Sequence, residues 1–507
     1  MRIDTSLAIL ASLGGAAAFW RMECRGQVGL ARIDPLINPG AVSSHAHAIH
    51  GSSGFNEAAT YEDLINGDCT SCAVAQDKSA YWAPTLYFRH DNGTYEAVQQ
   101  VGGMLAYYFL NKDLKDTNKK ITAFPNNFRM IAGDSTRRNY SVAGLDYTQP
   151  DPPKSDWGNL GQTNQHDLAQ RALGFNCLDY SGAAEPSLFR HYLPDKAFLD
   201  ANCKDGVRFE LSFPSCWNGK DTSSPDHKSH VAYPDTVLNG NCPEGFDVKL
   251  PGLFFETIWA TNAFVGVPGE FVISNGDVLG FGYHGDFISG WDADFLQAAV
   301  EQCTASSGMV QDCPLFTILN EDEQRKCKMP TPPMIASEKL AGVIGDALPG
   351  GVAIQYGPGP AIGNPAPSLA IAAAAPSEAA SADAPSVDAP SVDAPAPTSA
   401  EEFTGLPGGV FQEAPTSTPE VNAQAEPSPE PTPTPTPTPS DPPVPAGYEL
   451  LRTDYVTNGN VVSKIVVIET VEYVMLATET VTVTATFGAE NARRELHHLH
   501  RHNHRSH

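Results

Sequence analysis

The ten cysteines of this 507-residue chain lie between Cys24 and Cys327, and the C-terminal third contains none. In a secreted chain, an even number of cysteines favours disulfides. We therefore expect one cross-linked globular part, followed by a tail that cannot be stabilised in this way. Cys69 and Cys72 have CxxC spacing, which can also serve zinc binding or redox chemistry. The sequence contains no second CxxC, and this favours disulfides.

The N-terminus has the features of a secretory signal. A short n-region is followed by the apolar stretch "TSLAILASLGG" and by Ala16, Ala17 and Ala18, small residues suited to signal peptidase. We expect residues 1–18 to be a signal peptide and the mature protein to be extracellular or located in the cell wall. No later stretch stays apolar for the ~20 residues that a transmembrane helix needs, so we expect no such segment. Two sequons predict N-glycosylation at Asn92 and Asn139.

Residues 19–335 have the pattern of a mainly β globular domain. Short apolar runs alternate with Gly, Pro, Asn and Asp, as in "GEFVISNGDVLGFGYHGDF". Helical periodicity is limited to a few stretches, such as 165–173 and 294–302. The sequence predicts a disulfide-containing β-sandwich or jelly-roll-like domain with long loops.

Three segments of different composition follow this domain. Residues 336–447 are rich in Pro, Ala, Ser and Thr and include the run "PTPTPTPTP", which predicts a disordered linker. Residues 448–487 are rich in Val and Thr and predict a small β element or a self-associating segment, with a turn at 458–460. Residues 488–507 contain six histidines, which can chelate metals or become cationic at acid pH.

The acidic character of the chain limits its partners. The formal net charge is −27, which disfavours nucleic acids and anionic lipid surfaces because both repel an acidic protein. Cell-wall polysaccharide is the partner that we expect, and the sequence does not indicate an oligomeric state.

The stretch "SSHAHAIHG" places three imidazoles within six residues. If this stretch is a β-strand, His45 and His47 point to the same face, because side chains alternate along a strand. His50 can approach them from the turn that Gly51 helps to form. Neutral imidazoles are common ligands of zinc and copper, so these three histidines are candidate metal ligands.

Two further clusters combine histidine with aspartate. The segment "SPDHKSH" contains Asp226, His227 and His230, and "GYHGDF" contains His284 and Asp286. These histidines are the remaining candidate ligands of Zn or Cu, and the two aspartates are candidate catalytic bases. The alternative is that the three clusters are separate hydrogen-bonded groups in a loop-rich domain. A shared site requires the fold to bring distant segments together.

Aromatic side chains flank the second and third histidine clusters. Trp217 and Tyr233 bracket one cluster and Trp291 follows the other. Exposed rings beside carboxylates are typical of a carbohydrate cleft, which makes these three residues candidates for substrate binding, whereas burial in the β core is the alternative for them. Glu256, in the apolar run "FFETIW", is either a buried acid with a raised pKa or a residue directed outward.

Six segments of the globular part carry a resemblance to a known family: "FWRMEC", "ARIDPLINPGAVSSHAHAIHG", "FPNNFRM", "ELSFPSCWNGK", "SPDHKSHVAYP" and "GFGYHGDFISGWD". In this order they resemble the secreted fungal proteins grouped as domain of unknown function nineteen-ninety-six. The resemblance covers Phe19 to about Lys328 and excludes the linker, the Val/Thr-rich segment and the tail. It implies a secreted fungal protein and assigns no activity and no role to any residue.

Two functions are compatible with these features. In the first, a secreted or wall-associated protein has a His/Asp-lined, metal-dependent site that acts on wall polysaccharide, with Asp226 or Asp286 activating water. In the second, the protein is not an enzyme and binds glycan, copper or zinc at the cell surface. The sequence contains no G-x-S-x-G, Walker A, H-E-x-x-H or dinucleotide-binding motif that would point to another class of enzyme.

Overall fold

The computed structural model describes residues 18–116, 118–142 and 144–362, together with the backbone of 449–458 and 461–469. Residues 1–17 of the predicted signal peptide lie outside the described residues. So do most of the predicted linker (363–447), the end of the Val/Thr-rich segment (470–487) and the His-rich tail (488–507). The chain divides into two units, Met1–Pro415 and Thr416–His507, and each is described by itself.

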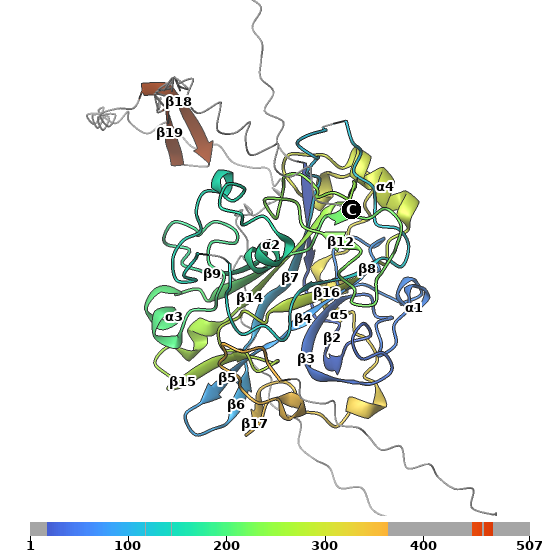
Figure 1. Ribbon diagram of the computed structural model, residues 1–507, viewed down its shortest axis with the longest axis vertical. Coiled ribbons are helices and arrows are strands. Elements are labelled where there is room, and N and C mark those ends of the chain that lie inside the picture. Colours follow the sequence, from blue (N-terminus) through green and yellow to red (C-terminus); the bar gives the residue numbers. More distant parts are fainter. Residues whose placement is uncertain (1–17, 117, 143, 363–448, 459–460, 470–507) are drawn as a thin grey trace, which may run out of the picture. The chain divides into compact units, whose positions relative to one another are not determined.

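Two five-stranded antiparallel sheets dominate the first unit, which confirms the prediction of a mainly β fold. In Figure 1, β7 and β14 run through the middle of this unit, with β9 on one side and β2 and β3 on the other. Sheet I consists of β1 (Phe19–Cys24), β7 (Gln100–Phe109), β14 (Gly252–Trp259), β10 (Val207–Ser212) and β9 (Leu173–Cys177), in this order. Sheet II consists of β2 (Gly29–Ile33), β3 (Val42–Gly51), β4 (Ala80–Pro84), β16 (His284–Ile288) and β8 (Arg129–Gly133).

The largest hydrophobic core lies between the two sheets. Alternate residues of β10, namely Val207, Phe209 and Leu211, are fully buried in it, together with Tyr81 and Phe287 of sheet II. The sheets therefore pack face to face as a β-sandwich.

A second apolar cluster covers the outer face of sheet II and includes Ile49, Trp82 and Ile131. Because sheet II is covered on both faces, even a strand such as β16 is buried along its whole length.

Smaller elements complete the first unit. A four-stranded sheet contains β15 (Gly269–Ile273), β5 (Leu86–His90), β6 (Tyr95–Ala97) and β17 (Val343–Gly345), and a three-stranded sheet contains β12 (Val231–Ala232), β11 (Cys216–Trp217) and β13 (Val248–Lys249). The α-helices are α1 (Tyr61–Ile65), α2 (Gln165–Arg171), α3 (Lys196–Asn202), α4 (Ala293–Gln302) and α5 (Glu321–Lys326). The 3-10 helices are η1 (Lys154–Asp156), η2 (Thr261–Phe264), η3 (Val310–Asp312), η4 (Pro333–Ile335) and η5 (Pro349–Gly351).

Helices α2 and α4 occupy the two stretches in which the sequence predicts helix. Each begins at a polar N-cap: the side chain of Asn164 accepts the N–H of Asp167, and that of Asp292 accepts the N–H of Phe295. In the described part of the chain, no helix is both long and apolar enough to cross a membrane.

All ten cysteines form disulfides, which confirms that prediction. The pairs are Cys24–Cys72, Cys69–Cys327, Cys177–Cys203, Cys216–Cys242 and Cys303–Cys313. The two cysteines of the CxxC segment belong to different disulfides, so they form neither a redox pair nor a zinc site.

The segments after the globular domain are described in part. Residues 336–362, which the sequence analysis places in the linker, include β17, η5 and the buried residues Leu340, Leu348 and Val352. In the second unit, β18 (Glu449–Asn458) pairs antiparallel with β19 (Val461–Glu469), and Asn458 lies opposite Val461. A β element is thus present in the Val/Thr-rich segment.

Candidate metal centre

Three of the predicted metal ligands converge on the outer face of sheet II. His45 and His47 lie on β3 and share one face of it, and His284 begins β16, two strands away in the sheet. One ligand atom from each imidazole lies within 4.8 Å of the other two. Gly133 pairs with His284 at a φ of +81°, and a Cβ there would lie 2.4 Å from the Tyr283 carbonyl oxygen, so glycine is required beside this strand.

Hydrogen bonds orient two of the three rings. His284 Nδ1 lies 2.9 Å from the carbonyl oxygen of Gly282 and His45 Nδ1 lies 3.0 Å from Ser44 Oγ. A carbonyl only accepts, so Nδ1 of a neutral His284 carries the proton and Nε2 has a free lone pair. The Nε2 atoms of His45 and His284 are 3.1 Å apart, close to the separation of about 3.3 Å between two nitrogens on one tetrahedral zinc ion.

Of the three rings of the triad, His47 has the fewest hydrogen-bond partners. It is 0% exposed, and neither of its nitrogens makes a hydrogen bond of good geometry with the described residues. Its ring centroid lies 4.4 Å from that of His45 and 5.9 Å from that of His284. A buried polar group without a partner is costly, and in native proteins it commonly marks a bound water or ion.

The three imidazoles are neutral at neutral pH. Burial lowers the pKa of His45 and His47 well below the ordinary value, and burial lowers the pKa of His284 to about 4. The neighbouring imidazoles add to the lowering for His45 and His47, because a second positive charge in the cluster would be repelled. Neutral rings are the form that binds zinc or copper.

Two buried carboxyl groups, Asp286 and Asp34, lie near the three histidines at the outer face of sheet II. Asp286 is 0% exposed, follows His284 by two residues on β16, and neither of its oxygens has a hydrogen-bond partner in the described structure. Burial raises its pKa well above the ordinary value, and the nearby charge of Asp34 raises it further. Asp34 is held by the N–H groups of Leu36 and Ile37, both 3.2 Å from its Oδ1, and burial raises its pKa to about 6.

The second histidine cluster lies next to this centre and does not enter the triad. His227 Nδ1 is 2.6 Å from Ser223 Oγ, and His230 Nδ1 is 3.0 Å from Ser224 Oγ. Asp226 is exposed and accepts hydrogen bonds from its own loop, including the N–H of Ser229 at 2.9 Å. These groups stabilise the loop itself.

The same loop contributes one residue that the sequence reasoning missed. Lys228 Nζ donates to the Gly133 carbonyl oxygen at 2.6 Å, beside His284, and its charge lowers the pKa of both His284 and Asp286. No sequence signal distinguishes Lys228 from other lysines, because its position depends on the loop lying over β8.

His50 points to the other side of β3. It lies opposite Tyr81, a residue of the core between the sheets, whereas its neighbour Ile49 lies opposite Trp82 on the outer face. Burial lowers the pKa of His50 to about 3, and the side chain of Gln100 opposes this shift.

Two of the three candidate substrate-binding rings are buried, and the third is half-buried. Trp291 is 0% exposed and donates to the Tyr108 hydroxyl at 2.9 Å, and Tyr233 is 6% exposed and donates to the Ser212 carbonyl oxygen at 3.0 Å. Trp217 is half-buried and donates to the Asp221 carbonyl oxygen at 2.8 Å. The sequon residues Asn92 and Asn139, by contrast, are exposed and accessible to glycosylation.

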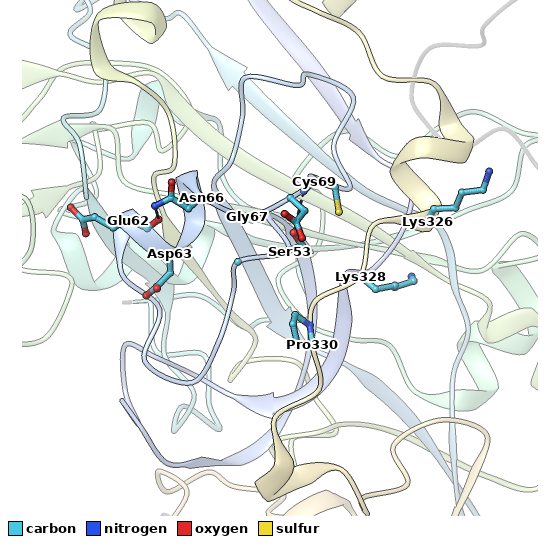
Figure 2. Close-up of a pocket in the computed structure, with 11 residues that line it drawn as sticks. Ser53, Glu62, Asp63, Asn66, Gly67, Cys69, Lys326, Lys328 and Pro330 are labelled. Carbon is cyan, nitrogen blue, oxygen red and sulfur yellow. Dashed lines mark hydrogen bonds between the residues drawn. The ribbon is translucent and has the colours of Figure 1, made fainter.

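A surface cavity of about 490 Å³ lies away from the triad (Figure 2). It is formed by the segments around α1 and after α5, with Lys326 and Lys328 on one side and acidic residues of α1 on the other. Its polar groups are engaged locally: Asp63 caps α1, and Ser53 Oγ accepts the N–H of Cys69 at 3.1 Å. None of the candidate metal ligands lines this cavity.

A family model described as "Domain of unknown function (DUF1996)" matches residues 34–291, which is about half of the chain. The chain belongs to the DUF1996 family. The matched part of this DUF1996 chain includes His45, His47, His284, Asp286 and Lys228, so the whole candidate metal centre lies within it. No curated protein and no solved structure matches the chain.

Proposed function

We propose that this DUF1996 protein binds one divalent transition-metal ion, zinc or copper, through His45, His47 and His284. The convergence of three neutral imidazoles from strands far apart in the sequence carries this proposal. Three nitrogen ligands suit zinc and copper and are a poor match for magnesium or calcium, which prefer oxygen ligands. Metal binding would also give a partner to His47, because neither of its buried nitrogens makes a hydrogen bond of good geometry with the described residues.

The site supports binding better than catalysis. A catalytic zinc keeps one coordination position open to water and substrate. The exposed fractions of His45, His47 and His284 are 6%, 0% and 4%, so substrate the size of a polysaccharide does not reach them without a rearrangement of the covering loops. We therefore favour a non-catalytic metal-binding protein over a polysaccharide-degrading enzyme. Asp286 is 0% exposed, so it does not reach a polymer substrate to activate water for it either.

An extracellular or cell-wall location fits this function. Five disulfides favour an oxidising compartment, and the predicted signal peptide would direct the chain there. N-terminal sequencing of protein secreted by an expression host tests this part. A mature chain that starts near residue 19 supports it, and retention of residues 1–18 contradicts it.

Metal analysis of the full chain tests the proposed site. The protein is purified without a metal-affinity column, loaded with zinc or copper, dialysed, and analysed by elemental mass spectrometry. We expect the wild type to retain one ion more than His47→Ala and than His284→Ala. The His-rich tail is present in all these proteins, so ions bound there cancel in the difference.

His50→Ala is the matched control for this experiment. His50 is on the same strand and as deeply buried as His47, but it faces the core between the sheets. We expect His50→Ala to retain as much metal as the wild type. Equal metal contents in the wild type, His47→Ala and His284→Ala, with circular dichroism showing folded protein, would refute the proposed function.

A further inference from the structure

An exposed aromatic cluster lies on the connection between β9 and α3 and on the first turn of α3. Figure 1 shows β9 and α3 together at one side of the first unit and β3 at the other. Phe189 is 44% exposed and Phe198 is 37% exposed. The guanidinium carbon of Arg190 lies 5.4 Å, 5.9 Å and 5.1 Å from the ring centroids of Phe189, Tyr192 and Phe198. We call these three rings with Arg190 the aromatic platform.

The aromatic platform is held rigidly from below. Arg190 forms a two-pronged ion pair with Glu185, at 3.0 Å to Oε2 and 2.8 Å to Oε1, and also donates to the Phe175 carbonyl oxygen at 3.0 Å. Its backbone carbonyl accepts the N–H of Phe175 at 2.9 Å, so the segment is bound to the edge strand β9. The Arg190 side chain is only 11% exposed. The rings thus surround a fixed cation and need little ordering when a ligand binds.

Backbone strain next to Phe189 is a second, independent observation. Leu188 has a φ of +58°, a conformation that non-glycine residues seldom adopt. It is kept there because its N–H donates, at 2.5 Å, to Oε2 of Glu210, which is 0% exposed. Strain of this kind persists only where the surrounding structure enforces it, and it concentrates at ligand-binding sites. Here the strained residue directs the next side chain, Phe189, into solvent.

The chemistry of the aromatic platform selects a neutral ligand with flat apolar faces and hydroxyl groups. Aromatic rings stack on such faces, and the Glu185 carboxylate, whose side chain is 22% exposed, offers acceptor lone pairs to hydroxyl groups beside them. Single-stranded nucleic acid also stacks on aromatic rings, but it needs a basic groove, and this chain has a net charge of −27. The same charge repels acidic polysaccharides. Pyranose rings of a neutral polysaccharide have flat apolar faces that stack on aromatic rings, and they carry no charge that the acidic chain would repel.

We propose that Phe189, Arg190, Tyr192 and Phe198 form a binding site for a neutral polysaccharide. Tyr147 extends this surface, since it is 37% exposed and its ring centroid lies 5.1 Å from that of Tyr192. The site is distinct from the metal centre in position and in chemistry, and it does not depend on a bound metal.

A binding isotherm tests the proposal. The full chain is incubated with insoluble β-1,3-glucan, β-1,4-glucan or chitin, and the protein left in solution is measured as a function of total protein. We expect saturable binding of the wild type to at least one of these matrices. Phe189→Ala and Phe198→Ala should each weaken it by about five- to tenfold, the loss expected for one stacking contact. Leu114→Ala, which removes a 65% exposed side chain elsewhere, should leave binding unchanged.

Two conservative variants separate stacking on a sugar from general apolar contact. Phe189→Trp should preserve binding because it keeps a flat aromatic face, whereas Phe189→Leu should weaken binding as much as Phe189→Ala. Equal binding by the wild type and Phe189→Leu would overturn the proposal, and so would the absence of saturable binding to all three matrices. A wild-type dimer in sedimentation experiments that becomes a monomer in Phe189→Ala, without any polysaccharide binding, would show instead that a second copy of the chain occupies this surface.

The polysaccharide-binding experiment and the metal-binding experiment can fail independently of each other. Removal of metal with a chelator, and His47→Ala, should both leave polysaccharide binding unchanged. Loss of binding in either case would overturn the independence of the two sites.

Discussion

The outer faces of the two sheets each carry buried ionisable groups, and the faces differ in how the charges of these groups are paired. On sheet I, Glu210 and Glu256 lie directly opposite each other on neighbouring strands, which would be unfavourable for two carboxylates alone. Arg208 compensates them at 2.7 Å from Glu210 and 3.6 Å from Glu256, and Tyr107 donates to Glu256 at 2.9 Å.

Sheet II presents the opposite situation. The two oxygens of Asp286 have no hydrogen-bond partner in the described structure, and neither nitrogen of His47 makes a hydrogen bond of good geometry, although both side chains are 0% exposed. A network whose charges are paired stabilises the fold, whereas buried polar groups without partners commonly mark a bound water or ion. Buried charge by itself therefore does not identify a functional site. Unpaired nitrogens alone do not identify one either, because neither nitrogen of His50 makes a hydrogen bond of good geometry with the described residues, although His50 faces the core between the sheets. The convergence of three neutral imidazoles is the more specific sign.

Among these predictions, removal of Arg208 from the outer face of sheet I should cause the largest loss of stability. Arg208→Met leaves two opposed, buried glutamates without their cation, and we expect the free energy of unfolding to fall by about 3–5 kcal/mol. Denaturant unfolding at pH 8 measures this. Arg325→Met is the control, because Arg325 is 53% exposed and its pair with Glu321 should contribute about 0.5 kcal/mol or less. Similar losses in the two variants would show that the sheet I network is not a structural unit.

A metal ion bound on the outer face of sheet II should stabilise the native protein against unfolding. At a free zinc or copper concentration about 100 times the dissociation constant, binding to the native state adds about 2.7 kcal/mol to the free energy of unfolding. We expect this gain for the wild type and for His50→Ala, and none for His47→Ala or His284→Ala. Thermal unfolding with and without the ion measures it. A gain of the same size in His47→Ala would mean that the stabilising ion binds elsewhere.

Matched substitutions on the outer faces of the two sheets should change the free energy of unfolding in opposite directions. Asp286→Leu replaces an unpartnered buried carboxyl with an apolar group of similar size, and we expect the metal-free protein to gain about 1–2 kcal/mol in stability. Glu210→Leu removes the partner of Arg208 and of the Leu188 N–H, so it should lose stability. Denaturant unfolding of both variants in the presence of a chelator tests the pair. A loss in both would mean that Asp286 has a stabilising partner, such as an ordered water.

The sequence supports the fold class and the disulfide prediction because both follow from local signals. Cysteine number and compartment predict cross-links, and short apolar runs between turn residues predict strands. The alternation in "SSHAHAIHG" places His45 and His47 on one face, and the structure has this arrangement. The pairing of His284 with them depends on β4 lying between β3 and β16, which is a property of sheet order rather than of any local pattern.

The less accurate expectations concern residues whose surroundings come from distant segments. The H-x-x-H spacing of His227 and His230 fits a metal site, but a left-handed backbone at His227, with φ of +53°, and serine partners turn these rings into loop-stabilising groups. The exposed rings of the aromatic platform carry no sequence signal that separates them from core aromatics. Phe189 directly follows Leu188, whose tether to Glu210 joins two residues that no spacing rule connects.

The smallest predicted effect concerns this tether, where the paired face of sheet I meets the surface loop. At most positions alanine is more stable than glycine, because glycine loses more conformational freedom on folding. At Leu188 the order should reverse, since a φ of +58° costs a non-glycine residue about 1 kcal/mol or more. We expect Leu188→Gly to be about 0.5–1 kcal/mol more stable than Leu188→Ala.

The exposed helical position Ala197 is the control for this comparison, because there the glycine variant should be less stable than the alanine protein by up to about 1 kcal/mol. The ordinary order at Leu188 would mean that the loop relaxes in solution. In that case Glu210 would not hold Phe189 in its exposed position, and the stabilising network on the outer face of sheet I would not extend to the surface loop.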